Sequence, residues 1–182
     1  MKTHLYLVLV VAAAAACQSR AGSSPTVEWG PVTNGVQLSI ALRQREEQKE
    51  SGKPGDLVVC TRNVSEHTVH VVRYGDPLEE FSFRIRFPSG RNVSLEQRPY
   101  PPGSARFTIE VKPNDAFSHP AIGLQSVCDL SEAGRYSIVL KEKVLAPGGP
   151  TEVTSNPLSF TVKAATSRKP PSSTNQTSIP GF

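Results

Sequence analysis

The sequence predicts an all-β domain, an antiparallel β-sandwich of seven or eight strands. Apolar residues recur at every second position in several short segments, as in strands that bury one face and expose the other. Turn-forming pairs such as Asn34-Gly35 and Pro54-Gly55 separate these segments. Proline is frequent, with 16 among 182 residues, and no segment inside the domain has a convincing helical period. Short strands at this spacing are typical of two packed sheets.

The first three predicted strands lie in the N-terminal half of the chain. VQLSIALR (36–43) places Val36, Leu38 and Ile40 on one face. DLVVCTRN (56–63) and HTVHVVR (67–73) follow, each bounded by turn residues and rich in β-branched side chains.

The later strands repeat the alternation. EFSFRIRF (80–87) is the clearest, because Phe81, Phe83 and Ile85 share one face while Arg84 and Arg86 share the other. The same pattern recurs in ARFTIEV (105–111), RYSIVLK (135–141) and LSFTV (158–162).

Composition divides the chain into four regions. Residues 1–16 have one basic residue near the start, Lys2, followed by an apolar run. Residues 17–26 are small and polar. Residues 27–163 hold nearly all the patterned apolar positions and form the predicted sandwich. Residues 164–182 are rich in Ser, Thr and Pro and have little to bury, so we expect a disordered tail. The chain is therefore predicted as a signal peptide, a flexible tether, one domain and a tail.

The apolar run at the start predicts export. About twelve apolar residues span roughly 18 Å as a helix, which is too short for a hydrocarbon core of about 30 Å. The run ends in AAAC (14–17), which resembles a bacterial lipobox, in which the cysteine receives lipid. The resemblance implies that Cys17 anchors the protein, and Gln18 after it favours the outer membrane, facing the periplasm. An ordinary signal cut after an A-x-A site is the alternative.

Two segments resemble bacterial immunoglobulin-like domains. GDLVVCTRNVSEHTVHV (55–71) looks like their second and third strands, and LSEAGRYSIVL (130–140) looks like a late strand with its tyrosine corner. The resemblance implies an immunoglobulin-like sandwich in which Gly134 and Tyr136 form a structural corner. It also implies that the Tyr136 hydroxyl bonds a backbone group near Leu130 to Glu132.

A third segment suggests an alternative function. FSFRIRFPSGRNV (81–93) is similar to a strand and turn of the BsuPI-type intracellular proteinase inhibitor family. This resemblance implies a peptidase inhibitor as the second candidate function.

Cys60 and Cys128 are the two cysteines of the predicted domain. Two thiols in one exported domain often pair, so a disulfide between them is one expectation and two separate thiols are the other. The bridge of immunoglobulin domains is not carried over, because Ile138 stands where that family has its second cysteine. No neighbouring group is expected to activate either thiol, so neither is predicted to be a nucleophile.

Several functions are excluded by residue pattern. His67 and His70 would point to opposite faces of a strand, so no metal site and no cofactor are predicted. Ser118 and His119 are adjacent in sequence, and such neighbours seldom point at each other. His67, His70 and His119 are all expected to be solvated. The chain has no catalytic or phosphate-loop motif, and its net charge of +4 is scattered. Neither an enzyme nor a nucleic-acid binder is predicted.

Arg84 and Arg86 form the remaining candidate binding site, on the predicted solvent-exposed face of their strand. Such a pair of arginines suits an anionic partner, and an ordinary solvated face is the alternative.

The sequence as a whole predicts a lipid-anchored envelope protein whose sandwich is a non-catalytic binding or structural module. The expected partners are the membrane, through the lipid, and another envelope protein, and no small-molecule substrate is identified.

Overall fold

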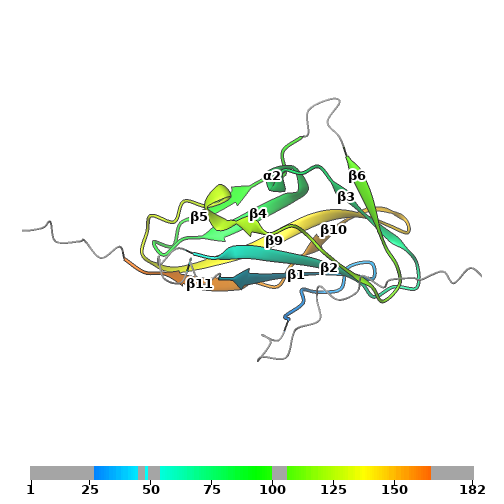
Figure 1. Ribbon diagram of the computed structural model, residues 1–182, viewed down its shortest axis with the longest axis horizontal. Coiled ribbons are helices and arrows are strands. Elements are labelled where there is room, and N and C mark those ends of the chain that lie inside the picture. Colours follow the sequence, from blue (N-terminus) through cyan, green and yellow to red (C-terminus); the bar gives the residue numbers. More distant parts are fainter. Residues whose placement is uncertain (1–26, 45–47, 49–53, 100–105, 165–182) are drawn as a thin grey trace, which may run out of the picture.

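Two antiparallel sheets pack face to face in the computed structural model, which describes residues 27–44, 48, 54–99 and 106–164 (Figure 1). The predicted antiparallel β-sandwich is therefore confirmed. The predicted signal peptide, the tether and all but the first residue of the predicted tail lie outside the described residues. In the part of the chain that is described, no helix combines the length and apolar character needed to cross a bilayer.

The smaller sheet has four strands in the order β1-β2-β7, with β8 also paired to β2. Its strands are β1 (Val36–Arg43), β2 (Asp56–Asn63), β7 (Ala116–Ser118) and β8 (Ile122–Gly123). β1 and β2 pair along their whole length. The predicted turn before β1 has positive φ angles of 48° at Asn34 and 76° at Gly35. Asparagine and glycine are the residues that tolerate this conformation best.

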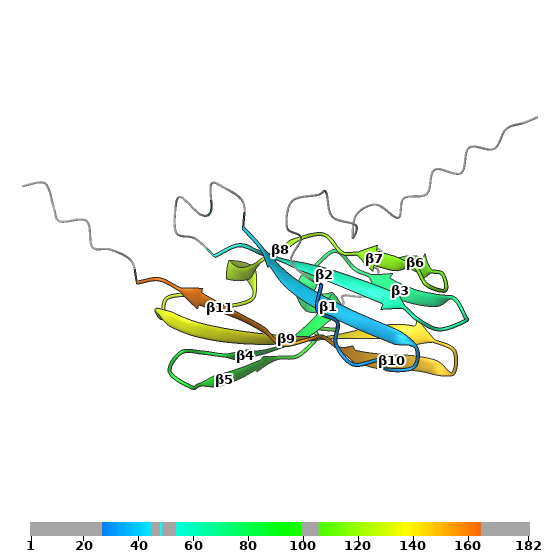
Figure 2. The same cartoon turned by 90° about the horizontal axis from the view of Figure 1, so that it is seen from below.

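The larger sheet has seven strands in the order β5-β4-β9-β3-β6, with β10 and β11 also paired to β9. Its strands are β3 (Val69–Arg73), β4 (Phe81–Arg86), β5 (Asn92–Leu95), β6 (Phe107–Val111), β9 (Gly134–Ala146), β10 (Gly149–Thr154) and β11 (Leu158–Val162). β9 is the central strand: its first part lies between β4 and β11, and its last part contacts β3 and β10. Figure 2 separates β1 and β2 from β4, β5 and β9 as two layers.

The structure has eleven strands among the described residues, where the sequence predicted seven or eight. β5, β7 and β8 are two to four residues long and are too short to show an alternating pattern. β9 continues to Ala146 and returns as β10 through a turn at Pro147 and Gly148, whereas the predicted strand ended at Lys141. A single helical turn, α2 (Pro77–Glu80), is capped by the Asp76 side chain and was not predicted.

The core lies between the sheets and follows the predicted alternation. In β4, Phe81, Phe83 and Ile85 are each 1% exposed. At one end of the sandwich Tyr136 packs against the rings of Phe160 and Phe87, each with its centroid 5.4 Å away. This aromatic cluster lies directly beneath the outer-face residues described below.

Candidate functional site

Arg84 and Arg86 are both exposed on the outer face of β4. The strand register places Ser94 of β5 opposite Arg84, and Ser137 of β9 opposite Arg86. Neither arginine forms an ion pair with any residue in the described ranges. Both guanidinium groups are therefore free to interact with a partner.

A hollow of about 450 Å³ lies at one end of this face, where β4, β9 and β11 run side by side. Its charged and hydroxyl-bearing lining residues are Arg86, Arg135, Tyr136, Ser137 and Ser159, and the Tyr136 hydroxyl is already bonded to the backbone oxygen of Glu132. Ser137 is directly opposite both Arg86 and Ser159, and Arg135 lies two positions before Ser137 on the same face. The hollow is thus lined by two arginines and two serines from three strands.

The wall of the hollow comes from the turn that follows β4. Phe87, Pro88 and Gly90 contribute to it, and Gly90 has a φ of 85°. Arg91 covers the Phe87 ring at 3.9 Å and lies 3.6 Å from the carboxylate of Glu132. None of the residues that line the hollow is acidic.

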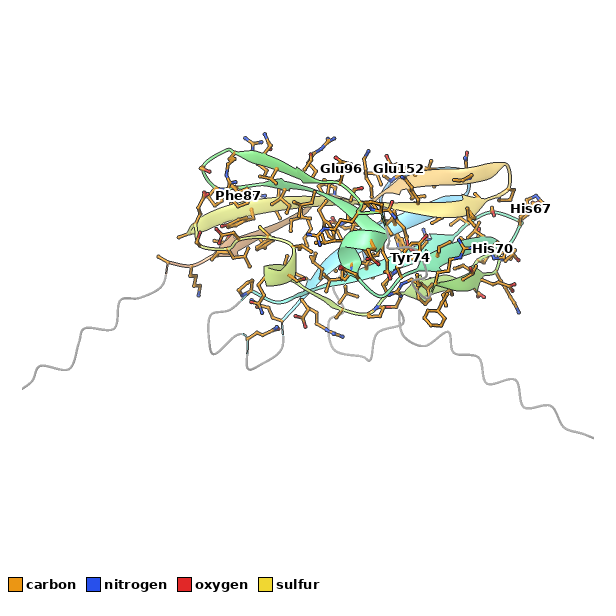
Figure 3. The ribbon with its side chains drawn as sticks, turned by 90° about the horizontal axis from the view of Figure 1, so that it is seen from above. His67, His70, Tyr74, Phe87, Glu96 and Glu152 are labelled. Atoms are coloured by element: carbon orange, nitrogen blue, oxygen red, sulfur yellow. The ribbon has the colours of Figure 1, made fainter. Side chains whose placement is uncertain are left out.

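Carboxylates on this sheet lie elsewhere. Glu152 pairs with Lys141 at 2.6 Å, and Glu96 lines a smaller hollow of about 80 Å³ together with Arg84. Figure 3 shows Glu96 and Glu152 near the middle of the molecule's long axis, with Phe87 toward one end and His67 at the other. The residues that line the larger hollow therefore carry a net positive charge, from Arg86 and Arg135.

A second polar group of residues is buried between the sheets. The Thr61 hydroxyl of β2 donates to Oε2 of Glu142 in β9 at 2.7 Å, and its oxygen lies 2.9 Å from Nε2 of His119. His119 Nε2 is 3.3 Å from Glu142 Oε1, and both side chains are only 1% exposed. The rings of Phe81 and Phe117 contact the imidazole edge to face. We name Thr61, His119 and Glu142 the buried triad.

A charged pair lies near the buried triad. Arg73 Nε contacts Glu80 Oε2 at 2.8 Å, and the other Glu80 oxygen accepts two backbone N–H bonds, from Tyr74 and Gly75. Figure 3 places Tyr74 close to the short helix α2 that carries Glu80.

The environment shifts the pKa values of the triad in opposite directions. Burial raises the pKa of the Glu142 carboxyl to about 8, with a smaller contribution from the carboxylate of Glu80. Burial also lowers the pKa of the His119 imidazole to about 3, and the charge of Arg73 adds to this effect. Both groups are therefore neutral near pH 7, and their contact joins a neutral imidazole to a neutral carboxylic acid.

The burial of His119 corrects a prediction, because this histidine was expected to be solvated and it is 4% exposed. Its ring contacts Thr61, a partner 58 residues away in sequence, and no local pattern indicates that contact. Glu142 was also missed, although it lies on the same alternating face as Ile138, Leu140 and Val144. The side chains of His119 and Glu142 are closed to solvent, and the hydrogen bond from Thr61 to Glu142 links the two sheets.

The predicted structural corner lies at the start of β9. Tyr136 is fully buried, and its hydroxyl donates to the backbone oxygen of Glu132 at 2.9 Å. Burial raises the pKa of this phenol. Gly134 has a φ of 133°, and a Cβ there would lie 2.7 Å from Pro88, so glycine is required.

The two domain cysteines are both buried, and the structure shows no disulfide between them. Cys60 lies in β2 opposite Ser39 and Ser118. The Cys128 thiol donates to the backbone oxygen of Asp129 at 3.4 Å, and burial raises its pKa to about 11. A thiol with this pKa is a poor nucleophile at neutral pH.

The paired histidines of β3 and its preceding turn do not form a site. His67 is exposed, and His70 lies opposite Glu110 and Leu145 on the outer side of the larger sheet. Within the described ranges, no group of three His, Cys, Asp or Glu side chains is arranged to hold a metal ion.

Comparison with known proteins finds solved structures of low similarity to this chain. No family model matches the chain, and no curated protein matches its sequence. A protein assigned as ApaA from Bordetella pertussis is 13% identical with a TM-score of 0.43, over 76% of this chain and 98% of its own. A protein from Archaeoglobus fulgidus is 13% identical with a TM-score of 0.33, over 76% of this chain and 95% of its own.

Proposed function

We propose that the chain is a lipid-anchored protein of the bacterial envelope whose sandwich is a non-catalytic binding module. The observation that supports binding is the basic end of the outer face, where Arg84, Arg86 and Arg135 are exposed. None of these three arginines pairs with an acidic residue in the described part of the chain. Exposed charge of one sign on a rigid sheet favours a partner with anionic groups.

The anchor is proposed from the sequence alone. The apolar run that ends at Cys17 supports lipidation, and Gln18 supports the outer membrane, facing the periplasm. Several acyl chains would hold the domain at the membrane almost permanently. The partner in this proposal is another envelope protein that presents acidic side chains to the arginines.

Cell fractionation tests the anchor. Wild-type protein is expected in the membrane fraction, and Cys17→Ser should move it to the soluble periplasm or leave an unprocessed precursor. A soluble wild-type protein whose mature N-terminus carries no lipid would contradict the anchor.

Site-directed cross-linking in intact cells tests the binding face. A photoreactive residue in place of Ser94, which lies opposite Arg84, should form a product with one identified envelope protein. Charge reversal by Arg84→Glu with Arg86→Glu should remove that product. A probe in place of Val32, which is 58% exposed outside this face, should never form it. If the product survives charge reversal, recognition does not depend on these arginines.

A further inference from the structure

We infer that the hollow bounded by Arg86, Arg135, Ser137 and Ser159 binds a phosphate group. This inference goes beyond the proposed function, because it assigns a ligand class to one defined part of the face. It can be tested on purified protein without any protein partner.

The donor set of the hollow matches the chemistry of phosphate. A guanidinium group offers parallel N–H donors that fit two oxygens of a tetrahedral oxyanion, and serine hydroxyls add single donors. Arg86 lies directly opposite Ser137, and Arg135 lies diagonally from Arg86 across the same strand pair. Diagonal neighbours in a sheet lie about 7–8 Å apart at the backbone, within reach of long side chains that converge on one ligand.

The charge balance favours an anion over a neutral ligand. No acidic residue lines the hollow, whereas the smaller hollow around Arg84 contains Glu96 and Lys141. The carboxylate of Glu132 lies at this end and is engaged by Arg91 and by the backbone N–H of Ser89. The two arginines of the hollow therefore keep their positive charge without an internal counter-ion among the described residues.

The strands beneath the hollow hold these donors in place. These four lining residues are sequence neighbours of the three aromatic residues in the cluster. Arg86 precedes Phe87, Arg135 and Ser137 flank Tyr136, and Ser159 precedes Phe160. All three rings are at least 92% buried and contact one another through Tyr136. A rigid backbone lowers the conformational cost of binding, so the site is suited to a compact oxyanion.

The size of the hollow leaves room for a phosphate that is part of a larger ligand. A volume of about 450 Å³ lies within the range of small-molecule sites. The phosphate could belong to a soluble ester or to a lipid headgroup, and both present the same oxyanion to Arg86 and Arg135.

Calorimetry with the chain from residue 17 onward, carrying Cys17→Ser, tests the site with inorganic phosphate at constant ionic strength. Wild type should bind, and Arg86→Ala or Arg135→Ala should weaken binding at least about tenfold, because each removes a charge-assisted contact. Ser137→Ala with Ser159→Ala should weaken it by a smaller factor. Arg98→Ala removes the same charge from an exposed position outside the hollow and should leave the affinity unchanged.

A second arm identifies the source of the phosphate. Vesicles of phosphatidylglycerol and of phosphatidylcholine are compared for co-sedimentation with the same variants. Binding to inorganic phosphate without vesicle binding supports a soluble ester, and Arg86-dependent binding to phosphatidylglycerol supports a lipid headgroup. The inference is overturned if neither probe binds, or if Arg98→Ala weakens binding as much as Arg86→Ala does. Either result leaves the anchor and the cross-linking experiment untouched.

Discussion

Replacing Glu142 by glutamine should remove a pH dependence of stability that the buried triad creates. Glu142 has a pKa of about 8 in the fold against an ordinary value of 4.5, so the folded protein holds a proton that the unfolded chain releases. This contribution is fully present below pH 4.5 and is lost as the pH rises toward 8. His119 has the opposite sign, because its pKa falls from 6.5 to about 3. Its contribution is present above pH 6.5 and is lost as the pH falls toward 3.

The two effects oppose each other between pH 4.5 and 6.5, where stability should be nearly constant. Above pH 6.5 Glu142 alone of the two still titrates, over about 1.5 pH units at about 1.4 kcal/mol each, so stability should fall by about 2 kcal/mol. The other groups that face Glu142 are Thr61 from β2, Arg73 from β3 and Glu80 from α2. The thiol of Cys128 titrates at higher pH, with a pKa of about 11, so measurements should end near pH 8.5.

Urea unfolding at pH 6 and pH 8.5 measures this effect. For wild type the midpoint should fall by about 1 M at the higher pH, if the urea dependence is about 2 kcal/mol per M. Glu142→Gln keeps the shape and an acceptor for Thr61, so its midpoint should hardly change with pH. Glu152→Gln removes an exposed carboxylate from the adjacent strand and should keep the wild-type pH dependence. If wild type has equal midpoints at both pH values, or Glu142→Gln retains the full difference, the reasoning is refuted.

Three further predictions concern the corner and the tail. Tyr136→Phe leaves the backbone oxygen of Glu132 without its donor and should cost about 1–2 kcal/mol, whereas Tyr136→Ala also opens a cavity and should cost about 3–5 kcal/mol by urea unfolding. Equal midpoints for wild type and both variants would contradict the corner. Gly134→Ala forces a Cβ against Pro88 at a positive φ and should cost at least about 1–3 kcal/mol; a neutral result would show that the turn relaxes. Ending the chain after Lys163 should change the melting temperature by no more than about 2 °C, because the removed residues have little apolar surface to bury. A larger loss would show that the tail docks on the domain.

Strand alternation was sufficient to predict the fold class and the outward direction of Arg84 and Arg86. Period-two patterns report which face of a strand is buried, and both arginines lie on the polar positions of β4. The same rule, applied to the end of β9, would have placed Glu142 inside the sandwich. The burial of Glu142 was not predicted because the predicted strand stopped at Lys141, one residue before Glu142.

The contacts of His119 and the hollow could not be predicted in this way. His119 follows the three-residue strand β7, and its partner Thr61 is far away in sequence. The hollow depends on strand register, because Ser159 of β11 and Arg86 of β4 each lie opposite Ser137 of β9, the strand between them. A single sequence shows which side chains share a face, whereas strand order and register are set by tertiary packing.

The central strand β9 carries both features, and this arrangement predicts that their effects are independent. Ser137 faces outward into the hollow, and Glu142 faces inward into the buried triad. Their Cα positions are five steps apart along the extended strand, which corresponds to about 16–17 Å. Sites further apart than about 7–10 Å usually contribute additively. The variant that combines Arg86→Ala with Glu142→Gln should therefore bind phosphate as weakly as Arg86→Ala alone and lack pH dependence as Glu142→Gln alone does. If the pair instead changes phosphate affinity by more than Arg86→Ala does, β9 transmits the state of Glu142 to the hollow, and the two features are coupled.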